Sequence, residues 1–244
     1  LGSVTGAHST AEVSLTLDAY VNASSTLTAG DDIEILALSY AETEASAKGR
    51  SGGGLAVGTA LTDAINEADV YAYMKGRIKD ADALVVTARS VDEADSIALA
   101  VAGGVAAGAG ADSDAIASPT VKAYVNSNID QKVRNDVSVT AQSKSAAYAE
   151  SEGITGSLIS VGVSLADAET EPFVQSYLTG SGSFDVGGDI LVQSLHNYSQ
   201  TGSSQDTDGA HADASAPGGS LIGGTGASAD ANSSATLSSR LGTD

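Results

Sequence analysis

The feature that most constrains the fold of this chain is an internal repeat of 51–53 residues. Tyr20, Tyr73, Tyr124 and Tyr177 each stand in a similar short phrase, at spacings of 53, 51 and 53 residues. A second phrase, which alternates apolar and polar residues, follows each tyrosine, and a glycine-rich phrase precedes each one. Three phrases that recur in one order predict a repeat array, in which each repeat buries the face of its neighbour.

The alternating phrase is typical of a β-strand with one buried face. In the third copy Val137, Val139 and Ala141 alternate with Ser138 and Thr140, which is a period of two. Clusters of Gly, Asn and Asp between such segments indicate turns. Short strands of this kind suit a sandwich, a barrel or a solenoid, and the fixed period selects the solenoid.

We therefore expect an all-β fold, a parallel β-solenoid, built as one repeat array over residues 1–244 with a longer last repeat from about Ser199. At roughly 20–29 residues per coil, each repeat would hold two coils. The chain would then hold about ten coils and be roughly 45–50 Å long at ~4.8 Å per coil. Residues 61–74 and 91–102 favour a helix by local propensity, but their aligned copies at 164–178 and 143–150 carry more Ser, Thr and Val. Because equivalent copies share a fold, we expect strands in these segments, with one or two short helical insertions as the alternative.

The composition predicts a thin interior and excludes two classes of partner. Apolar residues make up 42% of the chain, but aromatics are only 4% and there is no Trp, so small side chains must fill the core. The net charge of −20 argues against nucleic acid, whose binding needs Lys and Arg, and against an anionic membrane surface. There is no Cys, hence no disulfide or thiolate site. No apolar run is long enough to predict insertion into a membrane.

Candidate sites are few, and we predict no catalytic residue and no enzyme. His8, His196 and His211 do not recur between copies and have no metal-binding spacing. The pairs Asp206/Asp208 and Asp112/Asp114 resemble the start of an oxygen-rich calcium loop, so calcium is the one cofactor considered. A solvated acidic surface is the favoured interpretation of the same charges. Asp31–Asp32, Asp136 and Asp189 precede strands, where turn capping is the favoured role.

The phrases together resemble the Ala/Ser/Gly-rich repeats of very large bacterial surface proteins, the filamentous-haemagglutinin-like and leukotoxin-like filamentous adhesins. The resemblance is carried by residues 122–125, 188–192, 143–149 and 53–58, and it covers almost the whole chain. It implies a right-handed parallel β-helix shaft, export to the cell surface and a role in adhesion or matrix building. The second copy departs from the pattern at Asp82–Ala83 and carries a charged run from Lys75 to Asp82, which predicts a bulge or contact loop there.

The leading hypothesis is an extracellular bacterial filament or adhesin shaft. Its partners would be further copies of itself, end to end or laterally, or glycans and proteins of a host or surface. In a solenoid, equivalent residues of successive coils stack into ladders. The contact surfaces would be the faces that carry these ladders, together with the segments Lys75–Asp82 and Gln200–Ala216. One alternative is a calcium-dependent matrix or surface-layer protein. The other is a carbohydrate-active β-helix enzyme, which the scarcity of bases and aromatic platforms disfavours.

Overall fold

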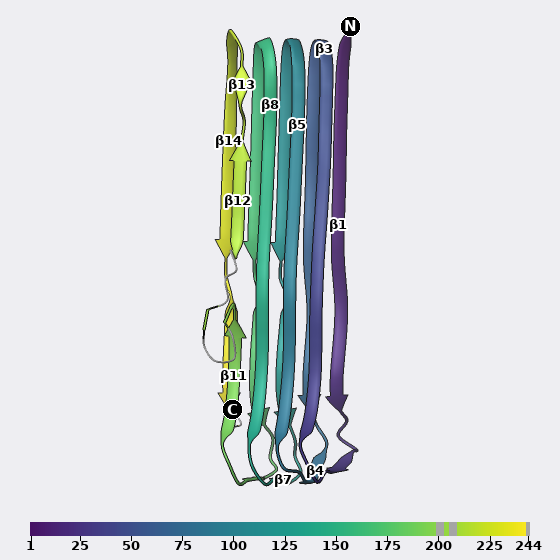
Figure 1. Ribbon diagram of the computed structural model, residues 1–244, viewed down its shortest axis with the longest axis vertical. Coiled ribbons are helices and arrows are strands. Elements are labelled where there is room, and N and C mark those ends of the chain that lie inside the picture. Colours follow the sequence, from purple (N-terminus) through teal and green to yellow (C-terminus); the bar gives the residue numbers. More distant parts are fainter. Residues whose placement is uncertain (199–202, 205–208, 243–244) are drawn as a thin grey trace.

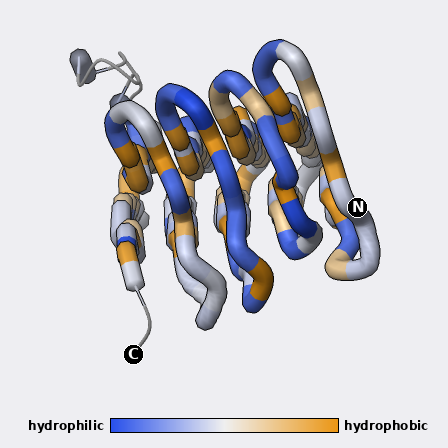
Figure 2. The backbone as a smooth tube through the Cα atoms, turned by 90° about the horizontal axis from the view of Figure 1, so that it is seen from below, coloured by the Kyte–Doolittle hydropathy of each residue, from blue (hydrophilic) through white to orange (hydrophobic). Residues whose placement is uncertain are grey.

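The computed structural model, which describes residues 1–198, 203–204 and 209–242, is a flattened parallel β-solenoid. Each coil rises along one wall from a base to a tip, reverses, and descends along a second wall to the base (Figure 1). We call these the ascending and descending walls. Viewed from below, the loops of the base are stacked one behind another along the axis of the solenoid (Figure 2).

Long strands form both walls, and the longest of them serve both. The ascending wall holds the first halves of β3 (Ile33–Met74), β5 (Leu84–Ala117) and β8 (Val137–Thr170), then β11 (Ile190–His196), β12 (Ala210–Ser215) and β13 (Gly218–Gly219). The descending wall holds β1 (Gly2–Val21), the second halves of β3, β5 and β8, and β6 (Thr120–Asn126), β9 (Phe173–Thr179), β14 (Ile222–Ser233) and β15 (Thr236–Leu241). Short strands at the base are β2 (Thr26–Thr28), β4 (Arg77–Asp80), β7 (Gln131–Val133) and β10 (Phe184–Val186).

The parallel β-solenoid is confirmed, but the prediction of about ten coils is wrong. The register joins Tyr20 to Tyr73, Tyr73 to Tyr124 and Tyr124 to Tyr177, so one repeat makes one coil. The reason is that the alternation of small residues continues without a turn from the base to the tip. The 20 residues of β1, at ~3.3 Å each, make a wall of about 65 Å, so the long dimension follows the strands. Residues 61–74 and 91–102 are strands, as expected.

The last coil carries an insertion that does not disturb the stack. His196 pairs with Ser143 at a separation of 53 residues, whereas Ala210 pairs with Ala147 at a separation of 63. The excess therefore falls between these two pairs, at the start of the segment Gln200–Ala216, in the repeat expected to be longer. Residues 210–215 of that segment form β12, whereas most of the insertion lies outside the described residues.

The charged segment Lys75–Asp82 lies at the base and holds β4. Leu27 pairs with Ile78, but Thr28 pairs with Asp80, so the register skips Lys79. A bulge is thus present where the departure from the repeat predicted one.

Three clusters of buried side chains fill the space between the walls. The cluster nearest the base contains large aliphatic residues such as Met74, Ile78 and Leu84. The two clusters above it are made of alanine only. The walls meet closely near the tip, where a methyl group on Gly58 would lie 2.6 Å from the carbonyl oxygen of Val101 on the other wall. The thin interior predicted from the composition is therefore confirmed for the upper part of the solenoid.

A buried polar band separates the aliphatic cluster from the alanine clusters. Ser90, Asp92 and Asn66 are all fully buried in it. The Asn66 amide nitrogen donates a hydrogen bond of 2.8 Å to the carbonyl oxygen of Ala41. Both Asp92 carboxylate oxygens, the Asn66 amide oxygen and the Ser90 hydroxyl lack a hydrogen-bond partner among the described protein groups. Burial raises the pKa of Asp92 to about 7.

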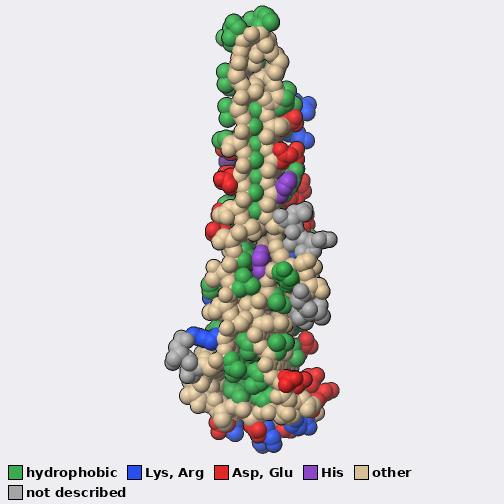
Figure 3. Space-filling view, turned by 90° about the vertical axis from the view of Figure 1, so that its left-hand side faces the viewer, with side chains coloured by type: hydrophobic (Ala, Val, Ile, Leu, Met, Phe, Trp, Pro, Cys, Tyr) green, Lys and Arg blue, Asp and Glu red, His purple; other side chains and the backbone are tan. Residues whose placement is uncertain are grey.

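The C-terminal edge of the stack exposes the interior. Every residue of β14 is exposed, although its inward residue Ala229 pairs with the buried Ala166 of the preceding coil. When this edge faces the viewer, hydrophobic side chains form a column between the two walls (Figure 3). The strands at this edge present backbone groups and apolar side chains to which a further layer of sheet can be added.

Candidate functional site

The four repeated tyrosines form a ladder on the outer side of the descending wall, close to the base. They come from β1, β3, β6 and β9. Successive ring centroids are 5.1, 4.8 and 4.7 Å apart, and the rings are parallel to within 9°. Stacking therefore covers the faces of the inner rings, which makes the ladder a poor platform for sugar rings. Tyr20, at the start of the ladder, is 56% exposed.

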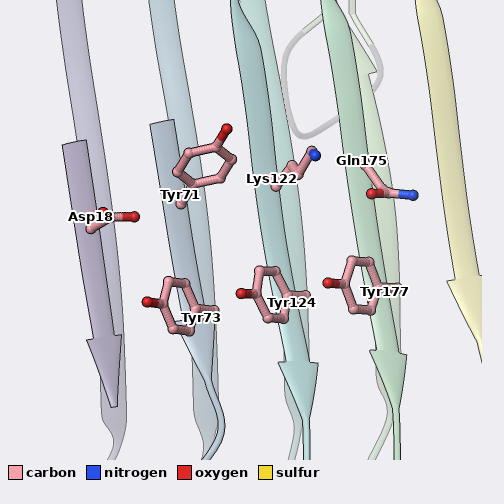
Figure 4. A pocket seen from close by; sticks show the side chains of 7 residues that line it. All are labelled: Asp18, Tyr71, Tyr73, Lys122, Tyr124, Gln175 and Tyr177. Atoms are coloured by element: carbon pink, nitrogen blue, oxygen red, sulfur yellow. The ribbon is translucent and has the colours of Figure 1, made fainter. Parts of the chain in front are cut away.

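A shallow groove of about 320 Å³ lies over this ladder (Figure 4). One side of it is formed by Tyr73, Tyr124 and Tyr177. The other side is the neighbouring row of outward residues, one from each coil: Asp18, Tyr71, Lys122 and Gln175. The groove thus crosses four coils and offers phenolic hydroxyls at the spacing of the strands.

Two lysine side chains, Lys122 in the groove and Lys75 outside its lining, lie against aromatic rings. The Lys122 ammonium lies 5.0 Å from the ring centre of Phe173 and 5.8 Å from that of Tyr71. The Lys75 ammonium lies 4.6 Å from the ring centre of Tyr73. Burial raises the pKa of the Tyr124 hydroxyl, and Tyr73 and the Asp18 carboxylate add to the rise. At neutral pH the Tyr124 hydroxyl is therefore a protonated donor, and the groove is suited to hydrogen-bonding a polar chain laid across the coils.

We expect the tyrosine ladder to contribute measurably to stability. Replacing Tyr124 by Ala removes two stacked pairs, each worth ~0.5–1.5 kcal/mol beyond its buried area. The free energy of unfolding in urea should fall by about 3 kcal/mol. Tyr124→Phe keeps the rings and should change it by less than about 1 kcal/mol. Equal losses for both variants would show that the hydroxyl, and not stacking, holds this face.

An acidic group that the sequence analysis did not single out as a site lies at the base. Oxygens of Asp31, Asp32 and Asp82 lie within 4.8 Å of one another. The Arg134 guanidinium lies 3.7 Å from Asp82 Oδ1 and donates a hydrogen bond of 2.8 Å to the carbonyl oxygen of Gly30. A protein cation thus already offsets part of this charge. Asp82 stands 50 residues beyond Asp32, which is about one coil. The sequence therefore shows that the two lie close together only once the coil length is known.

The aspartates expected to cap turns instead bind backbone amides of the next coil. Asp32 Oδ1 accepts a hydrogen bond of 3.1 Å from the amide of Ala83. Asp136 Oδ1 accepts one of 2.8 Å from the amide of Asp189. These carboxylates therefore fasten successive base loops to one another, which is a structural role close to the one favoured from the sequence.

The calcium candidates do not converge on one point in the described part of the chain. Asp112 and Asp114 point outward from β5, where Asp112 stacks between Leu61 and Leu165 and Asp114 between Asp63 and Asp167. Burial, followed by the repulsion of Asp112, Asp63 and Asp167, raises the pKa of Asp114 to about 6. Asp206 and Asp208 lie outside the described residues. The acids of β5 are thus part of a ladder on a flat strand face and not the start of a loop.

The three histidines have different surroundings. The His8 ring nitrogen Nε2 is 3.0 Å from Asp63 Oδ2. The His211 ring stacks on Tyr148 with centroids 5.2 Å apart. His196 is partly buried, and burial lowers its pKa.

The chain is a parallel β-solenoid in which equivalent residues of successive coils stack into ladders, and a groove lined by tyrosines lies on its outer side. Comparison with known proteins adds no closer identity: no family model, no curated protein and no solved structure matches this chain. The described residues contain no helix that is long and apolar enough to cross a membrane.

Proposed function

We propose that this chain is a length of a bacterial extracellular filament or adhesin shaft. The observation that supports this most is the stacking of one residue per coil in unbroken ladders, which makes each coil a template for the next. The net charge of −20 would keep such shafts soluble by mutual repulsion.

The groove over the tyrosine ladder is the surface on which an adhesin of this kind would hold a polar partner, a glycan or an extended peptide, through hydrogen bonds to the phenolic hydroxyls and not by stacking on the rings. It repeats with the coil, so a longer array would present a longer groove. Weak contacts repeated along it would combine into strong attachment by multivalency.

The proposal predicts assembly of the purified chain along the solenoid axis. Sedimentation over a range of concentrations should show species that keep growing beyond a dimer, and fibre diffraction should give a ~4.8 Å repeat along the filament. Ala229→Lys places a charge in the apolar column of the open edge and should abolish growth. Asn232→Lys, which places the same charge on the outward side of β14, is the control. A wild-type chain that never grows past a dimer would overturn end-to-end assembly.

A calcium-dependent matrix or surface-layer protein is the second candidate, and the group Asp31, Asp32 and Asp82 favours it. If that group binds calcium, the ion at a hundred times its dissociation constant should raise the stability by ~2.7 kcal/mol, and EDTA should reverse the gain. Asp82→Asn should remove the gain, whereas Asp213→Asn on the outer side of β12 should keep it. If the chain is instead a shaft that binds no calcium, its unfolding temperature should be the same in calcium and in EDTA.

A further inference from the structure

The outer side of the descending wall carries stripes near the tip. Outward residues of β3 and β8 form two apolar ridges, made chiefly of Val57, Leu61, Val161, Val163 and Leu165, which are 42–59% exposed. Level with Val57, Val161 and Val163 the outward residues of β5 and β14 are the glycines Gly108, Gly110, Gly224 and Gly226, whereas level with Leu61 and Leu165 they are Asp112 and Ser228. Ridge and groove therefore alternate from coil to coil. We call this surface the striped face.

The glycines of the striped face are not required by the packing of the chain itself. A methyl group on Gly224 or Gly226 would meet nothing within 4 Å, and one on Gly108 or Gly110 would meet only ordinary contacts at 3.8 and 3.9 Å. None of the four has a positive φ angle. Glycine weakens a strand by roughly 0.5–1 kcal/mol relative to alanine. Glycine inside a strand commonly marks the close approach of another surface, and here that approach would come from outside.

The two outer surfaces of the solenoid differ in charge at this height. On the ascending wall the outward residues include Lys48, Arg50, Glu150 and Glu152. On the descending wall no charged residue lies level with the four glycines. Next to the tip, one side of the molecule shows hydrophobic side chains and no charged ones, whereas the other side shows charged side chains among hydrophobic ones (Figure 3). A contiguous exposed apolar surface of this kind marks a contact site.

We propose that the striped face binds the striped face of a second copy of this chain. A two-fold axis parallel to the strands, midway between β5 and β8, reverses the order of coils in the partner. The β8 ridge then enters the partner's β5 groove, and the β3 ridge enters its β14 groove. Ridges two coils apart have a spacing of ~9.6 Å, and grooves have the same spacing, so the two faces interdigitate as a dry zipper.

The size of the face is compatible with a specific but modest dimer. Four coils at ~4.8 Å by four outward positions at ~6.6 Å give about 500 Å² per copy. The total of about 1,000 Å² reaches the lower limit of a specific interface. Because both copies use the same face, the contact closes after two chains. It is therefore distinct from end-to-end growth and does not depend on the proposed function.

An acidic ladder borders the face on the side of the base. Asp63, Asp114 and Asp167 stack next below the ridges. In the two-fold arrangement this ladder lies opposite its copy, so repulsion opposes the dimer at low ionic strength. The dissociation constant should consequently fall as salt is added, which is the opposite of an interface held by ion pairs.

The test is sedimentation equilibrium of the full chain carrying Ala229→Lys, which blocks end-to-end growth. We expect a species of twice the 24.0 kDa of one chain that does not grow further. Gly110→Val fills a groove and should weaken dimerisation at least tenfold without lowering the unfolding temperature, because valine favours a strand. Val163→Lys should weaken it as much, whereas Leu99→Lys on the other wall should not. A chain that stays monomeric at high salt, or a Gly110→Val variant that dimerises like its parent, would overturn the proposal.

Discussion

Replacing Ala98 by Leu should destabilise the upper half of the solenoid more than any surface change. Ala98 is 1% exposed and belongs to a cluster made only of alanine. Three added carbon atoms must enter a gap that was filled by methyl groups, and both walls are long, hydrogen-bonded sheets that cannot move apart locally. We expect the free energy of unfolding to fall by about 3 kcal/mol or more, which is the upper end of the range for overpacked cores. Urea unfolding would show this fall as a lower midpoint concentration.

Lys48→Leu is the matched control for this change. Lys48 lies one residue from the inward position of Ala47, faces outward, and pairs with Leu99 of the next coil. The fold thus already accepts leucine on this ladder. The control should stay within about 0.5 kcal/mol of the parent. Comparable losses for the two variants would mean that the walls are not closely apposed at this height.

Replacing Asp92 by Ser should stabilise the protein at pH 8 and change little at pH 4. The pKa of Asp92 rises from an ordinary value of 3.8 to about 7 on folding, because burial disfavours the charged form. The folded state therefore holds a proton that the unfolded state releases. The stability that this proton contributes is fully present below pH ~4 and is lost as the pH rises towards 7. The loss is at most about 4 kcal/mol, since one pKa unit corresponds to ~1.4 kcal/mol.

Serine is the apt replacement because Ser145 occupies the equivalent position of the next coil. Unfolding free energies of parent and Asp92→Ser should differ most above pH 7 and converge towards pH 4. Glu152→Ser, an outward change on the same wall, should leave the pH dependence of the parent intact. A difference between parent and Asp92→Ser that does not vary with pH would show that the carboxyl keeps its proton, or its charge, throughout.

The sequence analysis predicted the ladder but not the shape of the coil. The recurrence of Tyr20, Tyr73, Tyr124 and Tyr177 was enough to place the four rings in one stack, because a solenoid repeats its positions at the spacing of its strands. The coil count failed because it assumed a typical coil length of roughly 20–29 residues, whereas one wall of this solenoid is already a strand of 20 residues. The glycines Gly108 and Gly110 lie inside a 34-residue strand, and only the parity of the alternation shows that they point outward.

The site residues were harder to predict for a related reason. Asp18 and Lys122 belong to one row beside the tyrosines, with Tyr71 between them, and only the coil length places them there. Asp82 meets Asp32 for the same reason. Asp92 did carry a local signal, since it takes an inward position between Ser90 and Ala94 in the alternating pattern. Extending the alternation through each repeat, residue by residue, would have placed it inside.

The insertion in the last coil points to a use of this architecture in engineering. Thirteen residues, 197–209, stand where the preceding coil has three, 144–146, and yet both flanking strands return to the same ladders. Neighbouring coils therefore impose the register without help from the length of the connecting peptide. A foreign epitope or enzyme grafted at this height should be carried without unfolding its host. An array of such coils would display the cargo at regular intervals along a rigid support.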